Sequence, residues 1–268
     1  MIVTVEWHST YHYSTAVRQV HNELRVMPAE RDGQRRIGAS LTTDPTARLH
    51  PLTDAFGNEY HYFDLLGGIT QFSATLRATV DTAPDVVREA EASSLMQFLM
   101  LQPTHRSPFD LRIGELLRDA GPNGGPLSVA TRVMTLISDR FQFEVGRTVV
   151  EDTALDLLTL GHGVCQDFTH LMLATLRMGG VPARYVSGYL APASGATRAD
   201  ASHAWVQVYS DGAWHGFDPS NRQHQDERYV VVGVGRDYDD VPPLRGSFRG
   251  AAEQDWQASV QVATQQQQ

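Results

Sequence analysis

The stretch from Gly161 to Pro182 constrains the fold of this chain more than any other part of its sequence. It contains Cys165, the only cysteine in the 268 residues, placed just after two glycines that permit a tight turn. Apolar side chains then recur at positions 168, 171, 172 and 176, which is the spacing of one face of an α-helix. Gly179 and Gly180, with a proline soon after them, are typical of a helix end. We therefore predict a helix whose first turn carries the thiol.

A thiol at that helix start can have two roles. The free N–H groups and the positive end of the helix dipole would stabilise a thiolate, which is the nucleophilic form of cysteine. A single cysteine is more often simply a small buried residue of the core. Residues further along the chain favour the first role, because they supply a candidate base for Cys165.

The candidate base stands on a predicted β-hairpin. The dipeptide Asp211-Gly212 follows an alternating apolar stretch and is typical of a two-residue hairpin turn. Such a turn pairs Ser210 with Ala213, and this register makes His203 and Asp218 diagonal neighbours on one face. Their Cβ atoms would then lie about 7–8 Å apart or less, near enough for an imidazole–carboxylate hydrogen bond. A three-residue loop would shift the register by one residue and separate them.

Four blocks of the sequence resemble bacterial members of the transglutaminase-like superfamily, whose fold belongs with the papain-like cysteine enzymes. They are Gly163–Phe168, Gly180–Tyr189, His203–Trp205 and Gly216–Pro219, and they occur in the family's order and at its spacing. The resemblance implies that Cys165 is the nucleophile, His203 the general base and acid, and Asp218 the group that orients His203. The residues by themselves indicate the same combination of nucleophile, base and orienting acid.

The resemblance also bears on the fold and on the division of the chain. Residues 1–82 hold short apolar stretches between turn residues, which predict an antiparallel β-sandwich and resemble the β domain of the bacterial subfamily. Residues 83–250 are expected to form the catalytic domain, with helices at 84–92, 110–120, 126–140 and 153–160 around the helix that begins at Cys165. Residues 251–268 are expected to hold an edge strand at 258–263 and a frayed glutamine tail. The predicted fold class is α+β, a papain-like or transglutaminase-like core preceded by an antiparallel β-sandwich.

Other polar residues beside the candidate nucleophile are not expected to replace His203. Asp167 lies in the first helical turn, where an acid is expected to cap the helix, with tuning of the thiol as the weaker alternative. His162 and His170 flank the cysteine, but they lie on faces from which Asp218 cannot orient them.

The substrate-binding residues remain unassigned by the sequence. The backbone N–H of Cys165 is expected to stabilise an oxyanion, but no second donor can be named. Phe141 or Phe143 can line an acyl groove, or both rings can simply pack in the core. The segment Gly235–Gly246 resembles a signature of the bacterial subfamily, and it can either wall the active site or only brace it.

Composition narrows the classes of partner and cofactor. The net charge of −9 argues against nucleic acid or an anionic membrane as the main partner. One cysteine cannot form an internal disulfide or a cysteine-based zinc site, and we expect no metal and no cofactor. All 22 basic residues are arginine, so the chain cannot crosslink to itself through lysine amines. We find no signal-peptide pattern and no apolar run long enough to span a bilayer, and we predict a cytoplasmic protein.

The predicted function is amide or peptide acyl transfer through a thioester on Cys165, with a peptide or protein as substrate. A hydrolase, meaning a protease, an isopeptidase or a glutamine deamidase, is the first choice. Crosslinking of glutamine to an amine is the second, because the catalytic residues of the two reactions are the same. A catalytically silent scaffold that binds a partner is the alternative from another class. The sequence leaves the oligomeric state open.

Overall fold

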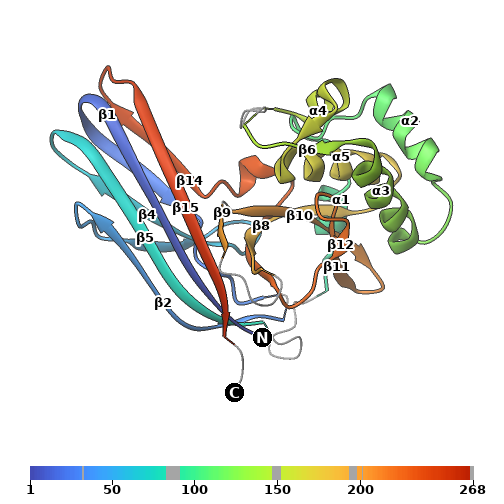
Figure 1. Cartoon of the computed structure of the whole chain (residues 1–268), viewed down its shortest axis with the longest axis horizontal. Coiled ribbons are helices and arrows are strands. Elements are labelled where there is room, and N and C mark those ends of the chain that lie inside the picture. The colour runs from blue at the N-terminus through green and yellow to red at the C-terminus, as the bar shows by residue number, and fades with distance from the viewer. Residues whose placement is uncertain (32, 83–90, 147–151, 193–197, 201, 266–268) are drawn as a thin grey trace.

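A computed structural model of the chain describes residues 1–31, 33–82, 91–146, 152–192, 198–200 and 202–265. It has a β domain on one side and a lobe of helices packed on a second sheet on the other (Figure 1). The helix predicted at 84–92 lies outside the described residues apart from its last two positions, and so does the glutamine tail beyond residue 265. Among the described helices, none is both long enough and apolar enough to cross a bilayer.

In the described residues, the β domain is an eight-stranded antiparallel sheet built from both ends of the chain and from the short strand β9. Its central strand β1 pairs along one side with β5 and then β4, and along the other with β15 and then β14. The strands are β1 (Ile2–Leu24), β2 (Arg35–Asp44), β3 (His50–Thr53), β4 (Glu59–Leu65), β5 (Ile69–Asp81), β9 (Arg198–Asp200), β14 (Leu244–Arg249) and β15 (Gln254–Gln265). The sequence predicts several short strands where β1 forms a single strand of 23 residues, because no glycine or proline interrupts it.

The sheet curls so that its two halves face each other. The bend in β1 coincides with Gln19, which has a positive φ of 50°, and with a shift of register toward β14 between Arg18 and His21. Phe63 of β4 and Phe72 of β5 meet edge to face at 6.0 Å between the halves, and both are fully buried. The β domain therefore has its own apolar core, as the sandwich prediction requires.

The second lobe is built on a five-stranded antiparallel sheet in the order β12-β11-β10-β8-β13. Its strands are β8 (Ala183–Leu190), β10 (His203–Ser210), β11 (Ala213–Asp218), β12 (Gln223–His224) and β13 (Tyr229–Gly235). A short parallel pair, β6 (Gln142–Phe143) and β7 (His162–Gly163), adjoins it. The helices are α1 (Ser94–Leu99), α2 (Leu111–Ala120), α3 (Pro126–Arg140), α4 (Ala154–Leu160), α5 (Cys165–Met178) and the 3₁₀ turn η1 (Tyr238–Asp240).

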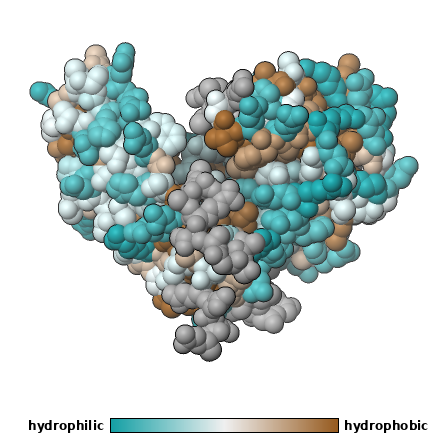
Figure 2. Space-filling model, in the orientation of Figure 1, coloured by the Kyte–Doolittle hydropathy of each residue, from teal (hydrophilic) through white to brown (hydrophobic). Residues whose placement is uncertain are grey.

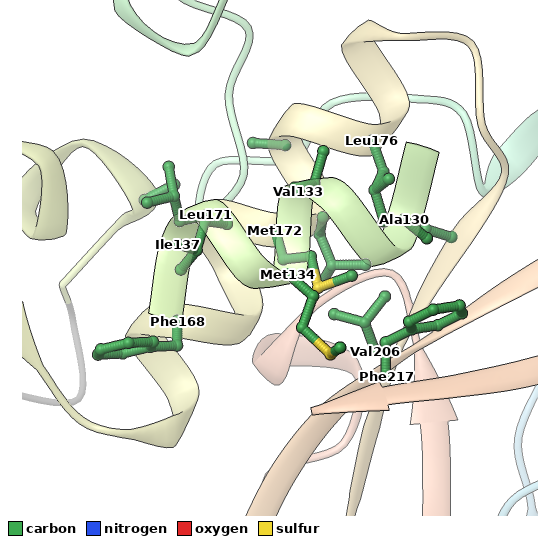
Figure 3. Close-up of a cluster of buried hydrophobic side chains, with 14 of the residues drawn as sticks. Ala130, Val133, Met134, Ile137, Phe168, Leu171, Met172, Leu176, Val206 and Phe217 are labelled. Carbon is green, nitrogen blue, oxygen red and sulfur yellow. The ribbon is translucent and has the colours of Figure 1, made fainter. Parts of the chain in front are cut away.

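Helix α5 is the centre of this lobe. Its residues 167–177 are all buried, and its apolar side chains pack between α3 and the sheet (Figure 3). Leu171 and Met172 of α5 lie in one cluster with Ile137 of α3 and with Val206 and Phe217 of the sheet. A helix buried on nearly all sides holds its first residue in a fixed place. The predicted bounds of α3 are confirmed, and α5 begins at Cys165 as predicted.

The two lobes share an apolar interface. Val230 and Val232 of β13 are buried in the same cluster as Val3 of β1 and Val260 of β15. The expected boundary at residue 250 falls between β14 and β15, and both of these strands pair with β1. The strand expected at 258–263 is longer in the structure, where it is β15 (Gln254–Gln265). Its residues Val260 to Val262 pair with β9 as well as with β1.

Candidate functional site

The start of α5 is shaped by Gly163 and Asp167. The Asp167 carboxylate accepts the Val164 backbone N–H at 2.7 Å, so it caps the helix as the sequence indicates. A Cβ atom on Gly163 would lie 2.6 Å from a carboxylate oxygen of Asp167, which real side chains do not tolerate. Glycine is therefore required at position 163 for Asp167 to cap the helix. Cys165, which is partly exposed, follows directly as the first helical residue.

The hairpin register predicted from Asp211-Gly212 is confirmed. The turn has positive φ values of 53° and 80°, and Ser210 pairs with Ala213. The ladder continues to the pair of Val206 and Phe217, one residue before Asp218. Beyond its end, His203 Nε2 and Asp218 Oδ2 lie 2.6 Å apart. A local turn signal thus placed a histidine and an acid together.

Asp218 is fully buried, and its carboxylate is surrounded by donors. Oδ2 accepts hydrogen bonds from His203 Nε2, the Tyr229 hydroxyl and the Asn221 amide, and Oδ1 accepts them from Ser220 and from the Asn221 backbone. Burial alone would raise the pKa of Asp218, but the hydrogen bond and charge of His203, with Asn221 and Ser220, hold it well below its ordinary value. The carboxylate stays ionised and fixed in orientation.

His203 is held between Asp218 and Cys165. Burial alone would lower the pKa of His203, but hydrogen bonds to Asp218 and Cys165 and the charges of both raise it to about 10. Since Nε2 is directed at Asp218, Nδ1 is the ring nitrogen left for the thiol. The ring also packs against Trp205, which is fully buried. The structure thus brings together all three residues that the sequence nominates.

Sequence reasoning missed the residues that support the acid. Tyr229 donates its hydroxyl to Asp218 at 2.8 Å and packs edge to face on Trp205. It comes from β13, which reaches the acid only through the strand order of the sheet, and the sequence carries no signal for that. Asn221 and Ser220 could have been found, because a short polar turn after a buried acid is a typical source of donors.

A pocket of about 540 Å³ opens at the thiol. Apart from the candidate catalytic residues, the described residues of its walls carry no charged side chain, and they come from both lobes. The lining residues are Phe143, Val145, Val164, Cys165, Gln166, Tyr185, Ser187, Leu190, Ser202, His203, Ala204, Ser220, Asn221, Tyr238, Pro243 and Val262. Of the two candidate aromatic residues, Phe143 lines the pocket and Phe141 is buried in the core.

The Gly235–Gly246 segment both walls and braces this pocket. Tyr238 lines it, and the Tyr238 backbone N–H donates to His170 Nε2 at 3.3 Å. Asp239 forms an ion pair with Arg106 at 2.8 Å. A Cβ atom on Gly235 would lie 2.5 Å from Asp240, so glycine is needed for the turn to close on itself. The sequence left open whether this segment walls the active site or braces it, and the structure shows that it does both.

One tyrosine and two histidines complete the surroundings of the site. Burial and nearby charges, with Cys165 the largest of these, raise the pKa of Tyr185 well above its ordinary value, so its hydroxyl keeps its proton. Burial and the cations Arg106 and Arg177 lower the pKa of His170 to about 3, so this ring is neutral. His162 of β7 faces Glu144, the residue after β6, at 4.0 Å. Neither histidine contacts Asp218 in the described residues. Nor do these residues contain a group of three or more His, Cys, Asp or Glu side chains placed to hold a metal.

Comparisons with known proteins identify the family. Residues 116–219, which include all three candidate catalytic residues, match the transglutaminase-like superfamily, and residues 3–81 match the bacterial transglutaminase-like N-terminal region. An uncharacterised protein of Mycobacterium leprae is 34% identical over 269 residues, covering 95% of this chain and 96% of its own. The chain belongs to the transglutaminase-like superfamily.

Other relatives extend this result. An uncharacterised protein of Mycobacterium tuberculosis is 34% identical to this transglutaminase-like protein over 267 residues, covering 88% of this chain and 84% of its own. The crystal structure of a "putative cysteine protease" from Cytophaga hutchinsonii superposes with a TM-score of 0.80 at 22% identity, over 100% of this chain and 92% of the other. At that identity the likeness concerns the fold. The predicted fold class, an α+β papain-like or transglutaminase-like core preceded by an antiparallel β-sandwich, is confirmed.

Proposed function

We propose that this transglutaminase-like protein is a cysteine-dependent amide hydrolase that acts on a peptide or protein through a thioester on Cys165. The observation that carries the proposal is the position of His203, whose Nε2 is 2.6 Å from Asp218 and whose pKa is raised by Asp218 and by Cys165. A thiol, a base next to it and a buried acid behind the base are the groups required for nucleophilic acyl transfer. The family match supports a cysteine enzyme and leaves the reaction type to experiment.

In the first step, the Cys165 sulfur attacks the amide carbon while His203 holds the thiol proton. Collapse of the tetrahedral intermediate breaks the carbon–nitrogen bond, and His203 gives the proton to the departing ammonia or amine. Asp218 stabilises the charged imidazole throughout and fixes its tautomer. The product is an acyl thioester on Cys165.

In the second step, His203 takes a proton from water, and the resulting hydroxide attacks the thioester. The carbon–sulfur bond breaks to release a carboxylic acid, and His203 returns its proton to the sulfur, which restores the free thiol. An amine that replaces water would form a new amide, which is the crosslinking alternative. Both outcomes use the same residues, so the measurement has to follow ammonia release, chain cleavage and amine incorporation in parallel.

We assign the oxyanion to two donors. One is the Cys165 backbone N–H, which lies in the first turn of α5, where N–H groups have no partner within the helix. The other is the hydroxyl of Tyr185, a residue that lines the same pocket and whose raised pKa keeps the proton on the hydroxyl. The Tyr185→Phe protein should then lose turnover but keep the alkylation rate of its thiol, and an unchanged turnover would remove Tyr185 from the mechanism.

The decisive test is the rate of alkylation of Cys165 by iodoacetamide across pH, because this is the only thiol in the chain. The raised pKa of His203, about 10, means that the imidazole keeps its proton through the neutral range and can pair with a thiolate there. We expect fast alkylation well below pH 8.5, which is about the pKa of a free thiol. The His203→Ala protein should react only as an ordinary thiol.

Turnover of glutamine-containing peptides completes the test, with the Cys165→Ala protein as the matched control. Ammonia release or chain cleavage that disappears in this control supports the hydrolase. Dominant incorporation of an added amine supports crosslinking instead. Slow alkylation that follows an ordinary thiol, together with no turnover, would contradict the proposal and favour a scaffold.

A further inference from the structure

Strand β15 has a free edge that leads to the candidate active-site pocket. Ser14 of β1 donates its backbone N–H to the Glu253 carbonyl at 2.9 Å, which fixes the alternation of hydrogen bonds along the strand that follows. Odd-numbered residues of β15 therefore face β1, and even-numbered ones face away. Of the latter, Gln254, Trp256 and Ala258 have no backbone partner in the described part of the chain.

The next even-numbered residues show that this edge accepts a strand. Val260 and Val262 pair with the three-residue strand β9, which runs antiparallel to β15. Strand β9 ends at Asp200, opposite Val260, and the chain reaches His203 three residues later. Val262 and Ser202 both line the pocket that holds Cys165. The free edge therefore begins where the chain turns from β9 into the candidate active site.

The free edge also borders an open hollow. Figure 2 shows a notch between the tip of the β domain and the helical lobe, and β15 runs along the β-domain side of it (Figures 1 and 2). Natural sheets usually block a free edge with lysine, proline or a bulge. Residues 254–262 contain neither lysine nor proline, and Asp255 is their one charged residue. Trp256 stays 52% exposed beside Tyr11, where its ring can cover part of a partner strand.

We propose that this edge docks the polypeptide substrate as an added antiparallel strand. The proposal rests on the hydrolase function above and names its substrate class: an extended, unfolded segment of a peptide or protein. The segment would pair with Gln254, Trp256 and Ala258 in line with β9, and its end nearest the pocket would present an amide to Cys165. From Gln254 to Ala258 the free edge is about 13 Å long, which suits a segment of about five residues.

The test measures binding separately from chemistry. The probe is a peptide of about ten residues with glutamine near its N-terminus, alternating valine and threonine after it, and a fluorophore at its C-terminus. Its Kd is measured by fluorescence anisotropy on the Cys165→Ser protein, which cannot form the thioester. Ala258→Pro is then introduced into the Cys165→Ser protein. Proline removes one outward backbone N–H and places its ring at the free edge, while the hydrogen bonds to β1 are kept.

Ala39→Pro is the matched control. Ala39 is an exposed alanine on the edge strand β2, whose one sheet partner among the described residues is β5 on its other side. We expect Ala258→Pro to raise the Kd about tenfold or more and Ala39→Pro to leave it unchanged. Melting temperature and Cys165 alkylation, measured on the variants that retain the cysteine, check the fold. Peptides N-methylated at every second residue, in both registers, need no change to the protein, and only one register should lose binding.

The outcomes separate the docking site from the proposed function. Tight binding that Ala258→Pro abolishes, without turnover of the peptide by the unaltered protein, supports the edge and contradicts the hydrolase. Turnover with the same Kd in the Ala258→Pro and Ala39→Pro proteins overturns the edge and leaves the hydrolase standing. No binding to the Cys165→Ser protein, or a dimer that Ala258→Pro converts to monomer, also overturns the docking site.

Discussion

At the scale of single residues, the candidate site depends on a carboxylate that is expensive to bury. Asp218 has no exposed surface, and its two oxygens are stabilised by donors from His203, Ser220, Asn221 and Tyr229. An ionised group without such partners would be protonated or would unfold the site. The donors thus keep a negative charge beside His203, and that charge keeps a proton on the imidazole.

Replacing Asp218 with asparagine tests this dependence. The change keeps the shape of the side chain but removes its charge, so the pKa of His203 should fall and the thiol should lose its charged partner. We expect turnover to drop by about 10²- to 10⁴-fold, a range that includes the loss known for the equivalent change in a serine protease. Alkylation of Cys165 at about pH 6 should slow in parallel.

The control for that experiment is Tyr229→Phe. It removes one of the hydrogen bonds to Asp218 and keeps the ring that packs on Trp205. Because the charge remains, turnover should fall only a few-fold, and stability by about 1 kcal/mol. If Asp218→Asn and Tyr229→Phe had equal, small effects, the acid would not be orienting a catalytic histidine.

At the scale of elements, the site depends on how the chain enters α5. The left-handed Gly161 ends α4, β7 pairs with β6, and Gly163 then passes close over the Asp167 carboxylate. These contacts fix the first turn of the helix, so the thiol is placed by backbone geometry more than by its own packing. A small change in this turn should therefore move Cys165 relative to His203.

Gly163→Ala is the corresponding prediction. The new Cβ would lie 2.6 Å from an Asp167 oxygen and 2.8 Å from its Cβ, so the cap must move. We expect a loss of about 1–3 kcal/mol in the free energy of unfolding, with a lower alkylation rate of Cys165 at neutral pH. The comparison is Gly38→Ala, where the added methyl group meets nothing within 4 Å. Thermal melting and iodoacetamide kinetics on both proteins test this prediction. Equal melting temperatures and equal alkylation rates in the two variants would mean that the turn is not rigid.

At the scale of the whole molecule, the two lobes depend on each other. Val230 and Val232 of the core sheet are covered by side chains from β1 and β15, and β14 and β15 have β1 as their main partner. Each fully buried valine contributes about 1.5–3 kcal/mol of burial free energy. Pocket residue Val262 also comes from the β domain. The β domain is thus part of the structure of the candidate site.

We expect the fragment 83–250 to fail to fold by itself. It would expose the valines of β13 to water and leave β14 without its partner strand. Circular dichroism and size-exclusion chromatography of the fragment, next to the full chain with Cys165→Ala, measure this. A soluble, cooperatively melting fragment whose thiol reacts at the full-length rate would show that the β domain is dispensable for the site.

The sequence by itself determined those features that depend on neighbouring residues. The bounds of α3, the start of α5 and the hairpin register follow from caps, helical periodicity and the conformation of Asp211-Gly212, which act over a few residues. The local register was enough to predict that His203 meets Asp218. The meeting of these two with Cys165 was predicted through the family resemblance, not through local patterns.

Only the tertiary structure decided which distant segments complete the site. Tyr229 reaches Asp218 because β13 lies beside β8, and Val262 reaches the pocket because β15 pairs with β1 at the opposite end of the chain. Such pairings are selected by burial of whole faces of the sheet and not by any turn or cap. The residues that carry them look like any other apolar strand in the sequence, since the free energy that selects them appears only when the two lobes are packed together.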